Sequence, residues 1–401
     1  MPHRHADPIV NFYLLALNSE AELAGGTGIF LYSRLNYLRA LGQRIRLRVL
    51  PVAGARRGGR LNTLVALPAY ILRHFRLLLG QPAGLYYLVY PKVPLVAFGV
   101  PTWLLPCAIL GYLLFWLRKK LTGAAVVVEI EDLPVENGYL RASETVPDLD
   151  RCRWRRLTLP EKLYTLLEWV IFHSADHIIH PSPAFSGHVA AKFAIPAERM
   201  RLYRREIYMP SYTSEPRLGP LPDLRRVNVF YSGNLTLDFL VPNLRQVIEA
   251  IAGLPDACLY VCGSDGAWIE EWCHQRGQDN VHYLGLLSHA DHDAAARQCQ
   301  VGLMLYGHSY ADFKCTAKYP AYVANGLAVL STDLHYLSQV IAEDGAGKAL
   351  PMNELVAELA RWVAQPELIE PYRSRAQTLS REYLRGTYMA EWFEPLMASG
   401  R

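Results

Sequence analysis

The stretch Asp312–Asp333 reads DFKCTAKYPAYVANGLAVLSTD, and it follows an apolar run at Val301–Tyr306. Its first half has the apolar spacing of a helix and breaks at Gly326, whereas Leu327–Leu330 is a short apolar run closed by polar residues. A short run of that kind, bounded by turn residues, is typical of a buried parallel strand. Strand, helix and strand together predict one βαβ unit.

Lys318 stands at the start of this predicted helix, after the carboxyl end of the preceding strand. Open α/β sheets bind ligands at that edge, and the backbone N–H groups of a helix start favour phosphate. A lysine adds a point charge to those groups. The stretch therefore predicts a cradle for a diphosphate, and a surface lysine on an ordinary core helix is the alternative.

Charge is distributed unevenly along the 401 residues, a length that predicts two or three domains. Residues 1–220 hold 27 Lys and Arg against 16 Asp and Glu, and residues 221–401 hold 14 against 21. A basic half of this kind suits an anionic partner such as phospholipid headgroups or a pyrophosphate. We expect no nucleic acid, because no recognition motif accompanies the charge; a merely solvated basic face is the other alternative.

The seven cysteines are odd in number and contain no C-x-x-C pair. This pattern favours reduced thiols in a cytosolic protein over a disulfide framework. The first apolar run is strand-like and lacks a signal-peptide pattern. We therefore expect the protein on the cytoplasmic side of the membrane.

Apolar strand-like runs alternate with helical patterns, which predicts an α/β chain. The strand-like run Ile9–Leu17 leads into a loop with Gly25-Gly26-Thr27-Gly28, then a helix and a second strand. This order begins many nucleotide-binding domains, although the full G-x-G-x-x-G is absent, and a turn that simply needs positive φ is the alternative. Met209–Asp223 holds four prolines and reads as a linker between domains.

The uncharged segment Val93–Leu117 is followed at once by Arg118-Lys119-Lys120. Its length would span a bilayer with the basic residues at the cytoplasmic end. Three prolines divide it and leave Cys107–Leu117 as the uninterrupted helix between two strand-like runs. We expect a buried or interfacial crossover helix, with a membrane span as the alternative. In the interfacial case four aromatic residues would lie among headgroups: Trp103, Tyr112, Phe115 and Trp116.

Three carboxylates, Glu129, Glu131 and Asp132, follow the apolar run Ala124–Val128. Carboxylates at a strand end face the ligand crevice, and alternation places Glu129 and Glu131 on one face and Asp132 on the other. One such group would suit proton abstraction from a hydroxyl substrate. A helix or loop cap is the alternative role.

Lys318, Tyr322 and Gly326, followed by an apolar strand, resemble the Lys-x-x-x-Tyr-x-x-x-Gly-x-Pro-Val-Ile pattern of GT-B glycosyltransferases that use nucleotide sugars. Ala328 replaces the usual proline, and Ala321 stands where many retaining members carry an acid. The resemblance is therefore to inverting bacterial hexosyltransferases, of the family-4-like kind that extends surface glycans. It implies two Rossmann-like domains facing a cleft, with a C-terminal helix crossing back to the first domain.

The resemblance also implies a role for each domain. Residues 1–215 would bind the acceptor, residues 216–384 would bind the nucleotide sugar, and residues 385–401 would pack back on the first domain. The donor-binding residues that it implies are Gly26, Gly233, Asn234, Gly263, Gly285, Tyr306, Asp312, Lys318 and Tyr322.

On the acceptor side, Ile130-Glu131-Asp132-Leu133 is similar to the apolar-His-Asp-apolar strand end of these enzymes, which implies Asp132 as the catalytic base. The segment Ser174–Ser182 is similar to their Ala-Asp-x-Ile-Ile-x-x-Ser strand and helix. Glu131 and His180 are acceptor-side candidates, and a packed or solvated histidine is the alternative for His180. The resemblance implies a hexose donor, expected to be UDP-linked, and a glycan or polyprenyl-pyrophosphate-linked acceptor at the inner face of the cell membrane, where the chain would be peripheral.

No metal and no cofactor are expected, since a lysine and helix dipoles would stabilise the leaving diphosphate. The segment His289–Asp293 invites a metal hypothesis, but Ser288 followed by acids is better explained as a helix cap. Two alternatives stay open: retaining transfer on the same fold, and a catalytically silent nucleotide- or glycan-binding subunit that partners another transferase.

Overall fold

The computed structural model describes residues 9–14, 26–40, 44–49, 71–80, 84–90, 104–131, 133–136, 152–180, 182–202, 208–209, 215–233, 235, 241–306, 317–333 and 335–385. For residues 9–14, 26–32, 44–49 and 335 it describes the backbone alone. The chain divides into two compact units: the second takes Ala24–Ser33 and Arg204–Tyr388, and the first takes most of the remainder, including Arg34–Tyr203.

The first unit is built on a six-stranded parallel sheet with strand order β2-β1-β3-β4-β5-β6. The central strand β3 is buried along its whole length, as is typical of parallel strands covered by helices on both faces. The strands are β1 (Ile9–Leu14), β2 (Arg44–Val49), β3 (Leu85–Tyr90), β4 (Ala125–Ile130), β5 (His177–His180) and β6 (Met200–Leu202). The helices include the part of α1 (Gly26–Ala40) from Arg34 onward, α4 (Leu105–Thr122), α6 (Leu159–Ser174) and α7 (Pro183–Phe193), with short 3₁₀ turns at Trp154–Arg156 and Ala197–Arg199.

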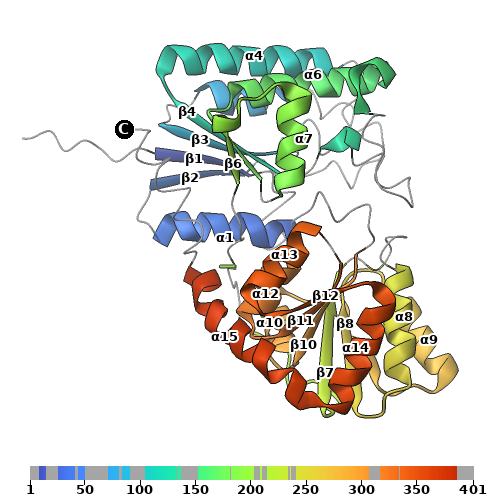
Figure 1. The fold of residues 1–401 in the computed structure, drawn as a ribbon. Coiled ribbons are helices and arrows are strands. Elements are labelled where there is room, and N and C mark those ends of the chain that lie inside the picture. The colour runs from blue at the N-terminus through green and yellow to red at the C-terminus, as the bar shows by residue number, and fades with distance from the viewer. Residues whose placement is uncertain are drawn as a thin grey trace, which may run out of the picture. The chain divides into compact units, whose positions relative to one another are not determined.

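Helices cover both faces of this sheet (Figure 1). On one face Tyr86 packs edge-on against Phe115 of α4, and on the other its neighbour Tyr87 lies with Arg34 of α1 around Glu129. The reversal of strand order after β2 explains this, because right-handed crossovers then carry the later helices to the opposite face.

The expected crossover helix is confirmed as α4, which connects β3 with β4. Its inner face is buried at Ala108, Ile109, Tyr112 and Phe115, and Gly123 ends it in the left-handed conformation at φ 68°. Among the described residues, no helix is both long enough and apolar enough to cross a membrane. The interfacial interpretation was wrong for Tyr112 and Phe115, because both side chains are buried: Phe115 packs on Tyr86 of β3, and Tyr112 packs on His74 and Phe75 of the helix 71–80.

The second unit has a six-stranded parallel sheet of order β12-β11-β10-β7-β8-β9. The predicted βαβ unit is confirmed as β10, α12 and β11, and Gly326 turns the chain at φ 77°. The strands are β7 (Val227–Ser232), β8 (Ala257–Cys262), β9 (Val281–Tyr283), β10 (Val301–Met304), β11 (Ala328–Thr332) and β12 (Gly347–Leu350). The helices include α8 (Val241–Ala252), α9 (Ala267–Arg276), α10 (His289–Ala296), α12 (Lys318–Ala324), α13 (His335–Asp344), α14 (Met352–Ala364) and α15 (Glu370–Arg385).

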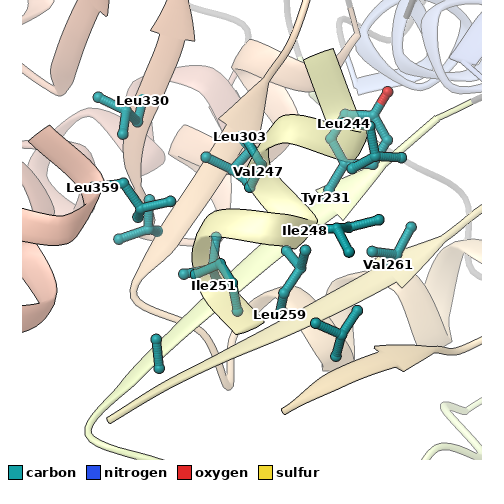
Figure 2. Close-up of a cluster of buried hydrophobic side chains, with 14 of the residues drawn as sticks. Tyr231, Leu244, Val247, Ile248, Ile251, Leu259, Val261, Leu303, Leu330 and Leu359 are labelled. Atoms are coloured by element: carbon teal, nitrogen blue, oxygen red, sulfur yellow. The ribbon is translucent and has the colours of Figure 1, made fainter. Parts of the chain in front are cut away.

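The core on one face of this sheet is formed by alternate residues of its strands and by the apolar stripe of α8 (Figure 2). The stripe residues Leu244, Val247, Ile248 and Ile251 follow the three-four spacing of an amphipathic helix. Burying a side chain of this size stabilises the fold by about 1.5 to 3 kcal/mol. On the other face, the buried carboxylate of Asp344 accepts hydrogen bonds from Tyr319 (2.8 Å) and Tyr383 (2.9 Å), which ties α13 to α12 and α15.

The described residues of the proline-rich segment 209–223 are packed on the second unit instead of forming a free linker. Asp291 accepts hydrogen bonds from the backbone of Arg217 and Leu218, and Leu221 is buried. Just before the segment, the N–H of Tyr208 donates to the carbonyl of Tyr383 at 3.2 Å. Prolines have no N–H to donate. The N–H groups of the neighbouring Arg217 and Leu218 are paired with a side chain, that of Asp291, instead of with other backbone. The predicted return of residues 385–401 to the first domain falls almost wholly outside the described residues.

Candidate functional site

The carboxyl ends of the central strands in the second unit bring together Gly233 after β7, Gly263 after β8, Tyr306 after β10 and Lys318 at the start of α12. Because all six strands are parallel, their carboxyl ends meet at one edge, where open α/β sheets bind ligands. These four residues, with Tyr231 of β7, are called the lysine cradle below.

Lys318 is the charged centre of the lysine cradle. Its Nζ atom donates to the Tyr306 hydroxyl at 2.8 Å and lies 4.6 Å from the centre of the Tyr306 ring and 5.6 Å from that of Tyr231. Burial works against the charged amine, but the surrounding tyrosines outweigh it and the pKa of Lys318 is raised above its usual value. The amine is therefore a fixed positive charge, held on aromatic faces that favour a cation.

Gly233 leaves the room that the lysine occupies. A Cβ atom at this position would lie 3.2 Å from Nζ of Lys318 and 3.1 Å from the hydroxyl of Tyr231. The resemblance implies Gly233 as a donor-binding residue, where a side chain would also obstruct the approach of a ligand to the backbone. The structure adds that a side chain would also crowd the amine.

The loops after β7 and β8 touch at their glycines. A Cβ on Gly263 would lie 1.8 Å from the carbonyl oxygen of Gly233, and Gly263 has a φ of 152°. Its N–H donates to the carbonyl of Gly285 at 2.9 Å, and Gly285 has a φ of 74°. Gly233, Gly263 and Gly285 are thus joined into one backbone surface, and the backbone angles of Gly263 and Gly285 are ones that favour glycine.

Tyr322 lies beneath the lysine cradle rather than in it. The side chain is fully buried, and its hydroxyl accepts from the N–H of Ser232 (3.1 Å) and donates to the carbonyl of Leu303 (3.2 Å). Gly302 gives its ring space, since a Cβ there would lie 2.6 Å from the ring. The structure thus gives Tyr322 a supporting role that fastens the end of β7 to β10, in place of the predicted donor contact.

Two residues that sequence reasoning missed complete the site. The hydroxyl of Tyr231 is buried and has no hydrogen-bond partner among the described residues, although it lies beside the position where a Gly233 side chain would be. Thr332, the last residue of β11, accepts from the N–H of Tyr306 and donates to its carbonyl, both at 2.8 Å. The only sequence signal for either was its place at a strand end.

In the first unit, Glu129 is not a free base. Its buried carboxylate forms an ion pair with Arg34 and accepts a hydrogen bond from the Tyr87 hydroxyl at 2.5 Å. The expectation that Glu129 faces a ligand crevice with Glu131 is therefore wrong for Glu129, which is fixed between α1 and β3. Glu131 is half-buried and also has interacting neighbours.

Three predicted site residues, Asp132, Asn234 and Asp312, lie outside the described residues, and their roles stay predictions. A fourth, Gly26, is the first residue of α1.

His180 is a core residue, as the alternative interpretation had it. It is buried, its Nδ1 accepts from the N–H of Ser182 at 2.9 Å, and its ring stacks on Phe185 at 3.9 Å. Burial lowers its pKa to about 3, so the ring is neutral at physiological pH. An acceptor-side role for His180 is not supported by this geometry.

A buried charged network lies on the α6 and α7 side of the first sheet. Glu136 accepts from His188 (2.9 Å) and Lys192 (2.6 Å), and Glu168 accepts from the Tyr90 hydroxyl (2.8 Å). Burial raises the pKa of Glu168 to about 7, although the charge of Lys192 opposes the shift. Glu136 lies six residues after the end of β4, so this network anchors the segment that follows Asp132.

The segment His289–Asp293 forms the helix cap that was expected. The Ser288 hydroxyl accepts from the N–H of Asp291 at 3.1 Å, and the buried Asp293 accepts from the hydroxyl of Tyr208 at 2.5 Å and from Asn325 at 3.0 Å. These carboxylates are therefore used in capping and packing.

A group that sequence reasoning missed, Asp223, Cys258 and His282, has metal-binding atoms within 4.8 Å of one another in the described part of the chain. It lies toward the amino-terminal ends of β7 and β8, away from the lysine cradle. Arg225 already donates to the Asp223 carboxylate at 2.8 Å. The positive charge of the arginine therefore balances this carboxylate, as a metal ion otherwise would.

Comparison with solved structures defines the fold. Sucrose-phosphate synthase from Thermosynechococcus elongatus superposes with a TM-score of 0.58 at 17% identity, over 98% of this chain and 100% of that one. WaaG, a glycosyltransferase involved in lipopolysaccharide biosynthesis, gives 0.58 at 15% identity, over 94% and 98%. The chain has the GT-B fold. A Listeria monocytogenes protein described as a UDP-N-acetylglucosamine 2-epimerase shares this GT-B fold, with a TM-score of 0.54 at 12% identity over 97% and 98%.

At the level of sequence, no family model matches the chain, and no curated protein matches it significantly. Identities below a fifth establish the GT-B fold alone, because one fold hosts many activities. Function has to be argued from the site.

Proposed function

We propose that the chain is a glycosyltransferase that moves a hexose from a nucleotide diphosphate sugar, expected to be UDP-linked, to an acceptor hydroxyl. The observation that carries the proposal is the amine of Lys318, set against Gly233 and two tyrosines at the carboxyl edge of the second sheet. A rigid cation beside glycine backbone is suited to a diphosphate, which needs positive charge and close approach.

The donor diphosphate would lie on the loops of Gly233 and Gly263, with its charge facing Lys318. As the bond from the anomeric carbon to the diphosphate oxygen breaks, the electron pair leaves with that oxygen. A fixed charge stabilises the oxygen most where water is excluded and the charge needs no reorganisation. Since Lys318 supplies that charge, we expect transfer without a metal ion.

On the acceptor side, the proposed base is Asp132, which would take the proton of the acceptor hydroxyl as its oxygen attacks the anomeric carbon. Direct displacement of this kind inverts the anomeric centre. Ala321 is consistent with it, because the acid that many retaining enzymes carry there is absent.

The proposed acceptor is a glycan or a polyprenyl-pyrophosphate-linked sugar at the inner face of the cell membrane. The solved structure of WaaG, a protein of lipopolysaccharide biosynthesis, shares the GT-B fold, and the basic residues 1–220 suit anionic headgroups and pyrophosphates alike. The enzyme would be peripheral there.

The test is titration of the full chain with UDP, followed by mass spectrometry of reactions with a panel of nucleotide sugars. UDP binding together with release of UDP and a glycosylated product supports the proposal. Binding without turnover favours the silent subunit, and a product with retained configuration favours the retaining mechanism. An epimerised sugar would favour the activity named for the Listeria protein. Failure to bind any nucleotide would overturn the proposal.

A further inference from the structure

Helix α4 is apolar on two sides. On its inner side Phe115 packs on Tyr86 of β3 and Tyr112 packs on the helix 71–80, and Figure 1 shows α4 and α6 together on one side of the sheet. Its outer side exposes a stripe that runs almost the length of the helix, with Leu110 59% and Leu121 79% exposed. The stripe consists of Leu110, Leu113, Leu114, Leu117 and Leu121. Apolar residues all round a helix are typical of burial on every side or of a membrane environment.

Helix α6 extends the stripe. The two helices pack together, and Trp116 of α4 meets Trp169 of α6 with ring centres 6.4 Å apart. Three further large apolar side chains are exposed on α6: Leu159, Leu166 and Trp169. These three and the five leucines of α4 are called the leucine face. Contiguous exposed apolar surface on a folded domain marks an interaction site more often than scattered leucines do.

Most of the exposed charges described on and beside these helices are positive, and the partly exposed Asp176 is paired with Lys119. Lys120 lies beside Leu121 on α4, and Arg73 and Arg76 are exposed on the helix 71–80, whose Phe75 fills the space at Gly111. Neither this helix nor α4 contains an acidic residue. The turn before α6 adds four exposed side chains, Arg153, Trp154, Arg155 and Arg156.

The two acids of α6 offset these charges only in part. Glu161 closes the capping box with Thr158 at the start of the helix, and Glu168 is fully buried. The leucine face is thus rimmed by cations.

We infer, resting on the membrane location proposed above, that the leucine face docks on an anionic phospholipid surface. Leucines on one helix side can enter the boundary between headgroups and acyl chains while the flanking helix lies in the plane of the membrane. Lysine and arginine on the rim then extend to lipid phosphates, and Trp154 and Trp169 lie at headgroup level. A protein partner would need acidic side chains placed opposite these cations. An anionic leaflet presents negatively charged headgroups over its whole surface.

The test is co-sedimentation of the full chain with vesicles, without nucleotide or acceptor. The probes are neutral phosphatidylcholine vesicles and vesicles that also contain phosphatidylglycerol. The parent should bind the anionic vesicles and be released by salt, since exposed charges are screened over about 8 Å at physiological ionic strength. Leu113→Asp combined with Leu117→Asp should bind at least about ten-fold more weakly, and Arg155→Ser combined with Arg156→Ser about five-fold more weakly for each arginine lost.

The matched control is Leu224→Asp in the second unit, where the leucine is 49% exposed, between the 37% of Leu113 and the 58% of Leu117. It should bind vesicles like the parent.

The inference is overturned if the parent does not bind anionic vesicles, if it binds neutral ones equally well, or if the double leucine variant binds like the parent. It is also overturned if sedimentation velocity shows a parent dimer that the leucine variant loses, since the face would then join two copies. UDP titration keeps this result separate from the donor site: failure of the parent to bind UDP would count against the transferase and not against the leucine face, and parent-like UDP affinity in the variants shows that they are folded.

Discussion

The Nζ atom of Lys318 lies 2.8 Å from the hydroxyl oxygen of Tyr306, twelve residues earlier in the chain. Tyr306 is itself held by Thr332, which bonds both its N–H and its carbonyl. The position of the amine is therefore set by the ends of two adjacent strands, β10 and β11, and not by the short helix α12 alone. A charge fixed in this way costs little reorganisation when an anion binds.

Replacing Lys318 with alanine should weaken nucleotide binding. The change removes a charge-assisted contact worth about 1.5 to 3 kcal/mol, so the affinity for UDP should fall by roughly 10- to 150-fold. Isothermal titration at equal folded concentration measures this. Lys348→Ala is the control, because that lysine is paired with Glu358 elsewhere in the same unit. Unchanged UDP affinity in Lys318→Ala would mean that the donor binds elsewhere.

Replacing Asp132 with asparagine should separate binding from chemistry. Nucleotide affinity should stay close to that of the parent while transfer collapses, because proton abstraction matters only when the acceptor attacks. Glu131→Gln is the neighbouring control and should retain more activity. Equal turnover by Asp132→Asn and the parent would remove Asp132 from the role of base.

Replacing Gly263 with alanine should damage both the fold and the donor site. Its Cβ would be 1.8 Å from the Gly233 carbonyl oxygen, so one of the two loops must move. We expect the free energy of unfolding to fall by about 3 kcal/mol and UDP binding to weaken with it. Gly253→Ala, where a Cβ would meet nothing closer than 3.5 Å, is the control for urea denaturation. A Gly263→Ala protein as stable as the parent would contradict this account of the loops.

The buried carboxyl of Glu168 should make stability depend on pH. Its pKa is raised to about 7 in the folded chain by burial, above the ordinary value of 4.5. The folded state therefore favours the protonated form, and this contribution is complete below about pH 4.5 and is lost as the pH rises through about 7. Glu168→Gln, which cannot ionise, should gain stability relative to the parent over that interval, by up to about 3 kcal/mol.

Urea denaturation of both proteins from pH 4.5 to 8 measures the difference. Using the difference between parent and variant cancels the titration of groups that both share. A constant gap across the range would show that Glu168 keeps its charge in the folded state.

The sequence by itself determined the α/β class, the βαβ unit around Lys318 and the crossover helix. Each follows from a local rule: a period of apolar residues, a residue that tolerates positive φ, or a cation placed after a strand. Rules of this kind act over a few residues, which is why the lysine at the start of α12 could be anticipated, whereas the GT-B fold was anticipated from the resemblance to known glycosyltransferases.

Tertiary structure alone decided which of the candidate polar groups are available. Glu129 meets Arg34 and Tyr87 from distant parts of the chain, His180 is stacked on Phe185, and Tyr322 is enclosed by Ser232 and Leu303. Likewise, α4 shows apolar residues on all sides in sequence, and only its packing leaves the leucines outside and the aromatic residues inside. Burial and pairing depend on contacts between residues far apart in the chain, and no local pattern encodes those.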